Sequence, residues 1–235
     1  MAIPATTISA YAPCTFRHEL KHQVNHAEAR VLSARLALLF GRDSHAEPDG
    51  TYRITSLYFD TPYDEALRQK IEGIDRREKF RLRYYGGAPS FVKLEKKIKQ
   101  GGLCSKRSSR LTLGEARRII EGDTAFLLES DDPLKVELYS KMRGKLLAPR
   151  IVTAYDREAY TYAPGNCRIT IDCNLRSATP EHFLDAAFSL PVNDGVVVVE
   201  VKYDAFLPDI VRMAVQIPNR RHAAYSKYAV CRKFG

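Results

Sequence analysis

Charged residues alternate with apolar ones along several short segments that have the composition of β-strands. The clearest segments are KFRLRYY from residue 79, FVKLEKKIK from residue 91 and VVVVEVK from residue 196. Because neighbouring side chains of a strand point to opposite faces, the charges of each segment share one face. Charge inside a fold is unfavourable unless it is paired, hydrated or bound to a ligand. The pattern therefore predicts either an antiparallel sheet with one side in water or a closed barrel with a wet interior.

Three further strand-like segments repeat this arrangement. Their shared faces carry Arg17, Glu19 and Lys21, then Thr153, Tyr155 and Arg157, then Arg168, Thr170 and Asp172. The segment before Glu200 favours the barrel, because five of the six residues from Val196 to Val201 are valine and a strand of this kind is expected deep in a fold. A glutamate beside Lys202 in such a place indicates a functional pair or a metal ligand.

The bulk composition limits the class of protein. The chain has 235 residues, of which 45% are hydrophobic, so it can bury a substantial core, and we expect one β-rich domain. Its 37 lysines and arginines outnumber 28 acidic residues and give a formal charge of +9, which favours phosphate-rich partners or an anionic membrane surface. Five cysteines without CxxC spacing are expected to be reduced thiols. We find neither a signal peptide nor an apolar stretch long enough to span a membrane, and we expect a cytoplasmic protein.

Capping patterns predict several helices between the strands. Asn25 and Glu28 are spaced as a capping box for a helix with an apolar stripe of Ala27, Val31, Ala34 and Leu38 that ends at Gly41. Further helices are expected before residue 73, after Thr112, after Asp132 with Pro133, from Pro208, and around residues 225–230.

Several site chemistries are disfavoured by the sequence. No Walker A pattern, GxGxxG or kinase-like motif set is present, so a nucleotide would be held by side-chain cations. Six histidines include no HExxH, and a zinc site is not expected. Arg81 and Arg83 are two residues apart on one strand, so their guanidinium groups could bind successive phosphates in a bidentate manner.

The order of several motifs resembles the vacuolar transporter chaperone (VTC) domain of the triphosphate tunnel metalloenzyme, or CYTH-like, superfamily. The motifs are RHELKH, YRITSLYFDTP, KFRLRYYGG, FVKLEKKI, YDREAY, RITID, VVEVKYD and YSKY. The resemblance implies an α+β fold in which an antiparallel β-barrel forms a triphosphate tunnel with helices packed around it. It also implies a short N-terminal extension, residues 1–15, and a single tunnel domain over residues 16–235.

The resemblance further implies a polyphosphate polymerase that transfers the γ-phosphate of ATP to inorganic polyphosphate with Mn²⁺ or Mg²⁺. Carried over by motif, it assigns catalytic phosphate contacts to Lys21, Arg81, Arg83, Lys97 and Arg157, further phosphate binding to Lys106, Arg168, Lys227 and Lys93, and metal binding to Glu200 and Glu19. One position departs from the polymerase pattern, because Ala224 stands where a second lysine precedes the SKY motif. Arg220, Arg221 or His222 could supply that charge.

Two other functions remain open. An inorganic triphosphatase of the same superfamily would use water as the acceptor and Glu19 or Glu95 as the base. A binding module without catalysis would bind polyphosphate or nucleic acid and use Tyr84, Tyr85 and Phe91 as stacking platforms. Nucleic acid is the less expected partner, since these aromatic residues fit the wall of a barrel equally well.

Overall fold

The computed structural model describes residues 15–44, 46–185, 189–192, 195–218 and 224–233. The predicted N-terminal extension lies outside these residues except for Thr15. The strands are β1 (His18–Val24), β2 (Gly41–Arg42), β3 (Thr51–Asp60), β4 (Arg77–Tyr85), β5 (Val92–Gln100), β6 (Leu103–Leu111), β7 (Ala148–Tyr162), β8 (Cys167–Ala178), β9 (Leu190–Pro191) and β10 (Val197–Tyr203). The helices are α1 (His26–Leu39), α2 (Glu65–Ile71), α3 (Leu113–Glu121), α4 (Pro133–Gly144), α5 (Asp209–Ala214) and α6 (Lys227–Cys231).

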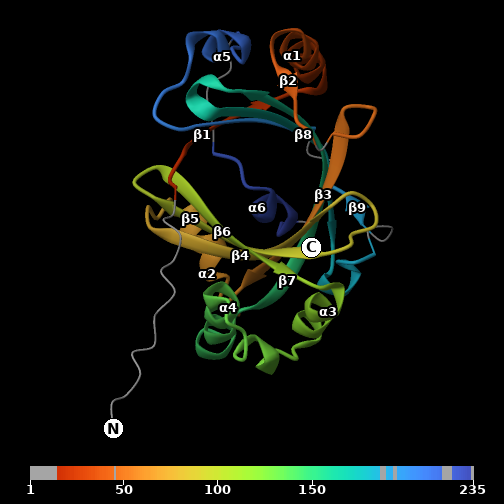
Figure 1. The fold of residues 1–235 in the computed structure, drawn as a ribbon, viewed down its shortest axis with the longest axis vertical. Coiled ribbons are helices and arrows are strands. Elements are labelled where there is room, and N and C mark those ends of the chain that lie inside the picture. Colours follow the sequence, from red (N-terminus) through yellow and green to blue (C-terminus); the bar gives the residue numbers. More distant parts are fainter. Residues whose placement is uncertain (1–14, 45, 186–188, 193–194, 219–223, 234–235) are drawn as a thin grey trace.

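The strands form one antiparallel sheet that curves around a central space (Figure 1). Its order is β1-β10-β8-β7-β3-β4-β5-β6, with β2 and β9 added beside β7 and β8. The two ends of this order meet at a single bridge, in which Arg17 and Cys104 exchange backbone hydrogen bonds of 2.9 Å. The α+β tunnel-like architecture predicted from the sequence is confirmed, but a continuous ladder does not close the described wall.

Helices cover the outside of the wall at two opposite places (Figure 1). Leu32 and Leu36 of α1 pack with α5 against β8 and β10, and Ile119 of α3 and Leu138 of α4 pack against β4 and β5. A third apolar cluster places α6 against β3 and β7, and Figure 1 shows α6 within the ring of strands. The apolar side chains of the wall therefore face outward over much of its circumference and leave polar alternates for the interior.

The structure corrects the predicted face of the first helix. The capping box of Asn25 is present, but the buried residues of α1 are Ala29, Leu32 and Leu36. The predicted stripe is exposed, with exposed fractions of 60% for Val31 and 88% for Leu38. Two apolar stripes at helical spacing coexist in this segment, and only the packing partner selects between them. The helix also ends before Gly41, which pairs with Thr161 as the start of β2.

The other predicted helices are present. Thr112 forms a capping box with Glu115, and Gly122 ends α3 in the left-handed conformation. Asp132 caps α4, and α5 follows Pro208. The four cysteines within the described ranges are free thiols, as expected, while Cys14 lies outside them. No helix in the described part of the chain is both long and apolar enough to cross a membrane.

Candidate functional site

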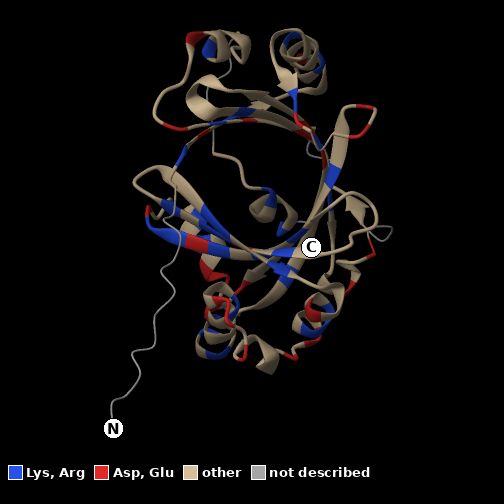
Figure 2. Cartoon of the chain, in the orientation of Figure 1, with Lys and Arg blue, Asp and Glu red and all other residues tan. Residues whose placement is uncertain are grey.

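A cavity of about 580 Å³ occupies the space inside the curved sheet. Its volume is in the range of small-molecule sites, and lysine and arginine make up about half of its lining residues. Most of these side chains come from β1, β4, β5, β6, β7, β8 and β10, because each strand points its charged alternates inward, and α2 and α6 supply one lysine each. Figure 2 shows basic residues along the strands that border this space.

The first cluster in the cavity is built on cross-strand neighbours of β4, β5 and β6. Arg81 lies opposite Glu95 and donates from Nε to Glu95 Oε2 at 2.7 Å, while Lys106 Nζ contacts Glu95 Oε1 at 2.7 Å. Arg83 donates from Nε to Ser56 Oγ at 2.9 Å. Burial opposes ionisation of Glu95, but Arg81, Arg83 and Lys106 outweigh burial and hold its pKa far below the usual range. Glu95 therefore stays charged and fixes the orientation of the two arginines.

Two tyrosine hydroxyls complete this arginine cluster. Arg81 Nη1 donates to Tyr58 Oη at 3.1 Å, and Arg83 Nη2 donates to Tyr155 Oη at 3.3 Å. Burial alone would raise the pKa of Tyr58, but Arg81, Arg83 and Lys79 reverse its effect and lower the pKa to about 7. These cations therefore favour the phenolate form of Tyr58.

A second cluster connects β7, β8 and α6. Arg157 binds Asp172 through two hydrogen bonds of 2.6 Å and 2.7 Å, and Lys227 Nζ lies 2.7 Å from Asp172 Oδ2. Burial alone would raise the pKa of Asp172. Arg157 and Lys227 outweigh burial and lower this pKa to about 2. The same lysine lies 4.4 Å from the centroid of the Tyr155 ring. This ion pair attaches the terminal helix to the wall and aligns two cations beside the first cluster.

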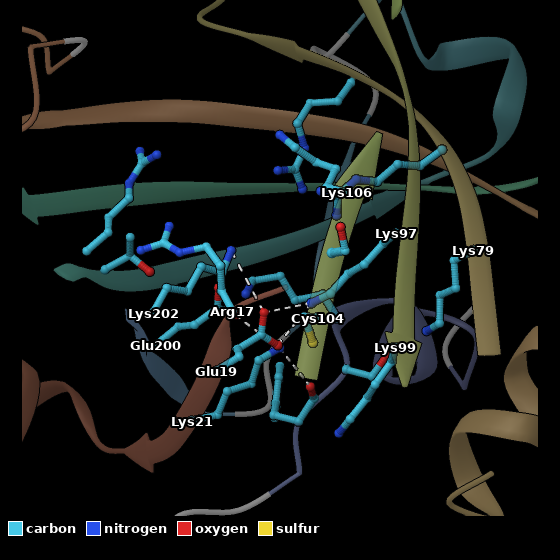
Figure 3. Close-up of a pocket in the computed structure, with 18 of the residues that line it drawn as sticks. Arg17, Glu19, Lys21, Lys79, Lys97, Lys99, Cys104, Lys106, Glu200 and Lys202 are labelled. Carbon is cyan, nitrogen blue, oxygen red and sulfur yellow. Dashed lines mark hydrogen bonds and ion pairs between the residues drawn. The ribbon is translucent and has the colours of Figure 1, made fainter. Parts of the chain in front are cut away.

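A third cluster lies where β1 pairs with β10 (Figure 3). Lys97 contacts Glu19 at 2.7 Å, Lys21 contacts Glu200 at 3.1 Å, and Lys202 contacts Glu200 at 2.8 Å. Burial and the neighbouring Glu200 raise the pKa of Glu19, but the three lysines outweigh both and lower it to about 2. The pKa of buried Glu200 is also lowered, since Lys202 and Lys21 outweigh its desolvation. Both carboxylates are ionised, as a metal ligand must be.

The donors of this third cluster fit a divalent ion only in part. Glu19 and Glu200 offer hard oxygen ligands, and the described residues contain no group of three or more potential ligands. Mg²⁺ and Mn²⁺ need few protein ligands where phosphate oxygens and water complete the coordination shell. The two glutamates therefore fit an ion that binds together with a phosphate substrate, which would also draw the lysines away from the carboxylates.

Comparisons with known proteins identify the family of the chain and a solved structure of similar fold. The family model of the VTC domain matches residues 16–234. The chain belongs to the VTC domain family. No curated protein sequence matches it. A crystal structure from Bacillus halodurans, provisionally described as an adenylate cyclase, is 12% identical over 86% of this chain and 87% of its own, with a TM-score of 0.52. A Pyrococcus horikoshii protein is 10% identical over 93% of this chain and 100% of its own, with a TM-score of 0.48.

Most of the residues predicted for this VTC domain site line the one cavity. They are Glu19, Lys21, Arg81, Arg83, Lys97, Lys106, Arg157, Arg168, Glu200 and Lys227. Arg168 donates to Tyr52 Oη at 2.8 Å and pairs with Asp43 at 2.8 Å. Ala224 also lines the cavity, but Arg220, Arg221 and His222 lie outside the described residues. The structure thus brings the predicted residues together, while their roles stay predictions.

Two predicted residues, Lys93 and Tyr84, lie elsewhere, while Tyr85 lines the cavity. Lys93 is not among the lining residues, and its Nζ lies 5.2 Å from the Tyr85 ring centroid and 5.9 Å from that of Phe91. The proposed stacking platform is not contiguous, because Tyr84 is buried on the outer face against Phe183. The prediction that Tyr84 could stack on a base is therefore wrong, since the alternation that turns Arg83 inward turns its neighbour outward.

The sequence argument missed several cavity residues. They are Lys70, Arg77, Lys79 and Lys99, together with the hydroxyl of Tyr58; Arg17, Tyr155 and Lys202 were placed on polar strand faces but were given no role in phosphate or metal binding. Part of the signal was present, since Arg77 and Lys79 continue the alternation of Arg81 and Arg83 along β4. Tyr58 gave no such signal, because an aromatic residue on a strand fits either face.

Proposed function

We propose that this VTC domain is a polyphosphate polymerase that transfers the γ-phosphate of ATP to an inorganic polyphosphate chain. The observation that carries the proposal is the basic cavity inside the curved sheet of this VTC domain, where carboxylates hold most of the lining arginines and lysines in place. Phosphoryl transfer passes through a loose transition state whose charge is spread over oxygens, so fixed cations that align donor and acceptor supply most of the catalysis.

Each cluster has a part in this scheme. Arg81 and Arg83 bind the phosphate that is transferred, because Glu95 and the hydroxyls hold their guanidinium planes in the cavity. Arg157 and Lys227 bind a neighbouring phosphate. Glu19 and Glu200 would hold Mn²⁺ or Mg²⁺, which would neutralise charge on the phosphate oxygens. When substrate and ion bind, Lys21 and Lys97 leave these carboxylates and contact phosphate oxygens instead.

The electrostatics support a phosphate acceptor over water. Hydrolysis needs a base near the attacking water, and Glu19 or Glu95 was the candidate. Arg81 and Lys106 engage Glu95, and Glu19 is assigned to the metal ion in this scheme, so neither carboxylate is free to deprotonate water. The terminal phosphate of a polyphosphate chain is already ionised and needs no base, so the same cavity serves transfer better than hydrolysis.

Product analysis tests the proposal. The purified protein is incubated with ATP and Mn²⁺, and the products are resolved on a gel and by nucleotide chromatography. We expect ADP together with polyphosphate chains that lengthen with time. Orthophosphate released from tripolyphosphate without chain growth would identify a triphosphatase. Salt-sensitive binding of polyphosphate or single-stranded nucleic acid without metal-dependent turnover would identify a binding module.

A further inference from the structure

Four basic residues of the cavity wall differ from all the others in their ion pairing. They are Lys70 on α2, Arg77 and Lys79 on β4, and Lys99 on β5. Every other lysine and arginine that lines the cavity is paired with a carboxylate within 4.0 Å. Within the described part of the chain, no such pair involves any of these four residues. We call them the unpaired cluster.

The strand register shows that basic residues take the place of carboxylates opposite the β4 residues of this cluster. Arg81 lies opposite Glu95, the next inward position places Lys79 opposite Lys97, and the one after it places Arg77 opposite Lys99. Like charges directly opposite each other on a sheet are destabilising. Glu19 compensates Lys97, and in Figure 3 Lys79 and Lys99 lie apart from the carboxylates of Glu19 and Glu200.

The nearby Asp75 does not supply the missing ion pair. Asp75 accepts hydrogen bonds from the backbone N–H of Gly101 at 2.9 Å and of Gly102 at 3.3 Å, so both its oxygens serve the turn between β5 and β6. Arg77 donates to the backbone carbonyl of Ile74. Asp75 attracts Lys99 and Arg77 without forming an ion pair within 4.0 Å, so one more distant carboxylate faces the four cations of the cluster.

The surroundings make this arrangement unfavourable in the free protein. Burial lowers the pKa of Lys79 to about 8, and Lys97, Lys21 and Lys70 lower it too, while Tyr58 acts in the opposite direction. Burial and the charges of Arg77, Lys21 and Lys99 likewise lower the pKa of Lys70. Four cations held together in this way form a site for a multivalent anion, because an anion replaces their mutual repulsion with attraction.

We propose that the unpaired cluster is an extension subsite that binds further phosphates of an inorganic polyphosphate chain, beyond the phosphates held by Arg81 and Arg83. The identity of the anion rests on the proposed function. Arg77 and Lys79 also line a second hollow of about 550 Å³, next to α2 and the end of α4. Glu78, Phe80 and Lys96, which are outward alternates of β4 and β5, line this hollow too, so it lies beside the wall and outside the first cavity. Tripolyphosphate is too short to occupy the three clusters and the extension subsite together.

The test compares two probes, inorganic tripolyphosphate and a long-chain inorganic polyphosphate, by calorimetry without metal or nucleotide. The variant is Lys79→Met with Lys99→Met, and the charge-matched control is Arg30→Met with Arg117→Met, at exposed positions on α1 and α3. We expect the double variant to lose about tenfold more affinity for the long chain than for tripolyphosphate. Equal losses for the two probes, or no loss for either, would overturn the extension subsite.

Thermal unfolding without ligand gives an independent readout. Removal of two mutually repelling cations should raise the melting temperature of the free protein, whereas residues that serve only the fold should lower it when replaced. Neither measurement requires turnover. The results can therefore reject the extension subsite while the polymerase assay supports the proposed function, or support the subsite while that assay shows no polymerase activity. A polymerase that lengthens chains normally in the double variant, with unchanged affinity for the long chain, would reject the subsite and keep the proposed function.

Discussion

The contribution of a single arginine depends on the groups that hold its plane. Arg83 is buried, and Ser56 and Tyr155 orient its guanidinium through Nε and Nη2. Arg83→Lys keeps the charge but removes the planar fork, so we expect the rate of ATP turnover to fall by about 10²–10³-fold. Steady-state kinetics with Mn²⁺ measures the loss, and the exposed Arg110→Lys on β6 is the control. Activity within about twofold of the wild type would remove Arg83 from the catalytic set.

Tyr58 provides a spectroscopic measure of the charge around the arginine cluster. Its phenol should titrate near pH 7 in the free protein, and the ultraviolet difference absorbance of phenolate measures that titration. Bound phosphate neutralises Arg81 and Arg83, so the pKa should rise and the phenolate signal at neutral pH should weaken on addition of tripolyphosphate. Tyr58→Phe assigns the signal, which must vanish in that variant. A titration at the ordinary tyrosine pKa of about 10 would contradict the electrostatic account.

Glu200 tests the metal site at the same scale. Glu200→Gln keeps the shape of the side chain but removes the charge that a divalent ion needs, so we expect metal-dependent turnover to be lost while the fold is retained. Activity as a function of Mn²⁺ concentration measures the effect, and circular dichroism checks the fold. The exposed Glu121→Gln on α3 is the control. Unchanged activity at saturating Mn²⁺ would exclude Glu200 as an essential ligand.

At the scale of elements, α6 is positioned by polar contacts with the buried end of β3. Tyr228 Oη donates to Asp60 Oδ2 at 2.6 Å, and the same aspartate accepts from the backbone N–H groups of Thr61, Ala66 and Leu67. Tyr228→Phe removes a charge-assisted hydrogen bond, so we expect the free energy of unfolding to fall by about 1.5–3 kcal/mol. Urea denaturation measures it, with the exposed Tyr63→Phe as the control. A change below about 0.5 kcal/mol would mean that apolar packing alone holds α6 in place.

The same scale shows what the sequence could and could not predict. Alternation along β4, β5 and β10 was sufficient to predict the inward face, because a period of two leaves only one choice once the apolar alternates face a core. Helical spacing, by contrast, did not predict the buried face of α1. Both apolar stripes of this helix had helical spacing, and the strands beneath Leu32 and Leu36 decided which stripe is buried. Alternation failed for Lys93, which shares a strand face with Lys97 but lies beyond the cavity. Face can be predicted from the sequence, whereas position along the tunnel depends on tertiary packing.

The whole molecule also shows why the wall need not be closed by a complete ladder. The edge strands β1 and β6 meet through Arg17 and Cys104, and Lys97 of β5 reaches Glu19 of β1 across the interior. Ion pairs between distant strands thus complement the single backbone bridge. The sequence could not predict this closure, because it depends on the curvature of the sheet and not on any local pattern.

The charge imbalance of the cavity makes the stability of the whole domain depend on an anion. A ligand that binds only the folded state at about 100 times its dissociation constant adds about 2.7 kcal/mol, which corresponds to a rise in melting temperature of roughly 5–10 °C for a domain of this size. We therefore expect tripolyphosphate to raise the melting temperature, measured by differential scanning calorimetry, and added salt to reduce the rise, because salt screens the attraction. Arg83→Ala should reduce it as well, since it removes one phosphate contact. An equal rise with sulfate at the same ionic strength, or an undiminished rise in Arg83→Ala, would show that the anion does not bind in the cavity and would remove the physical basis of the proposed phosphate site.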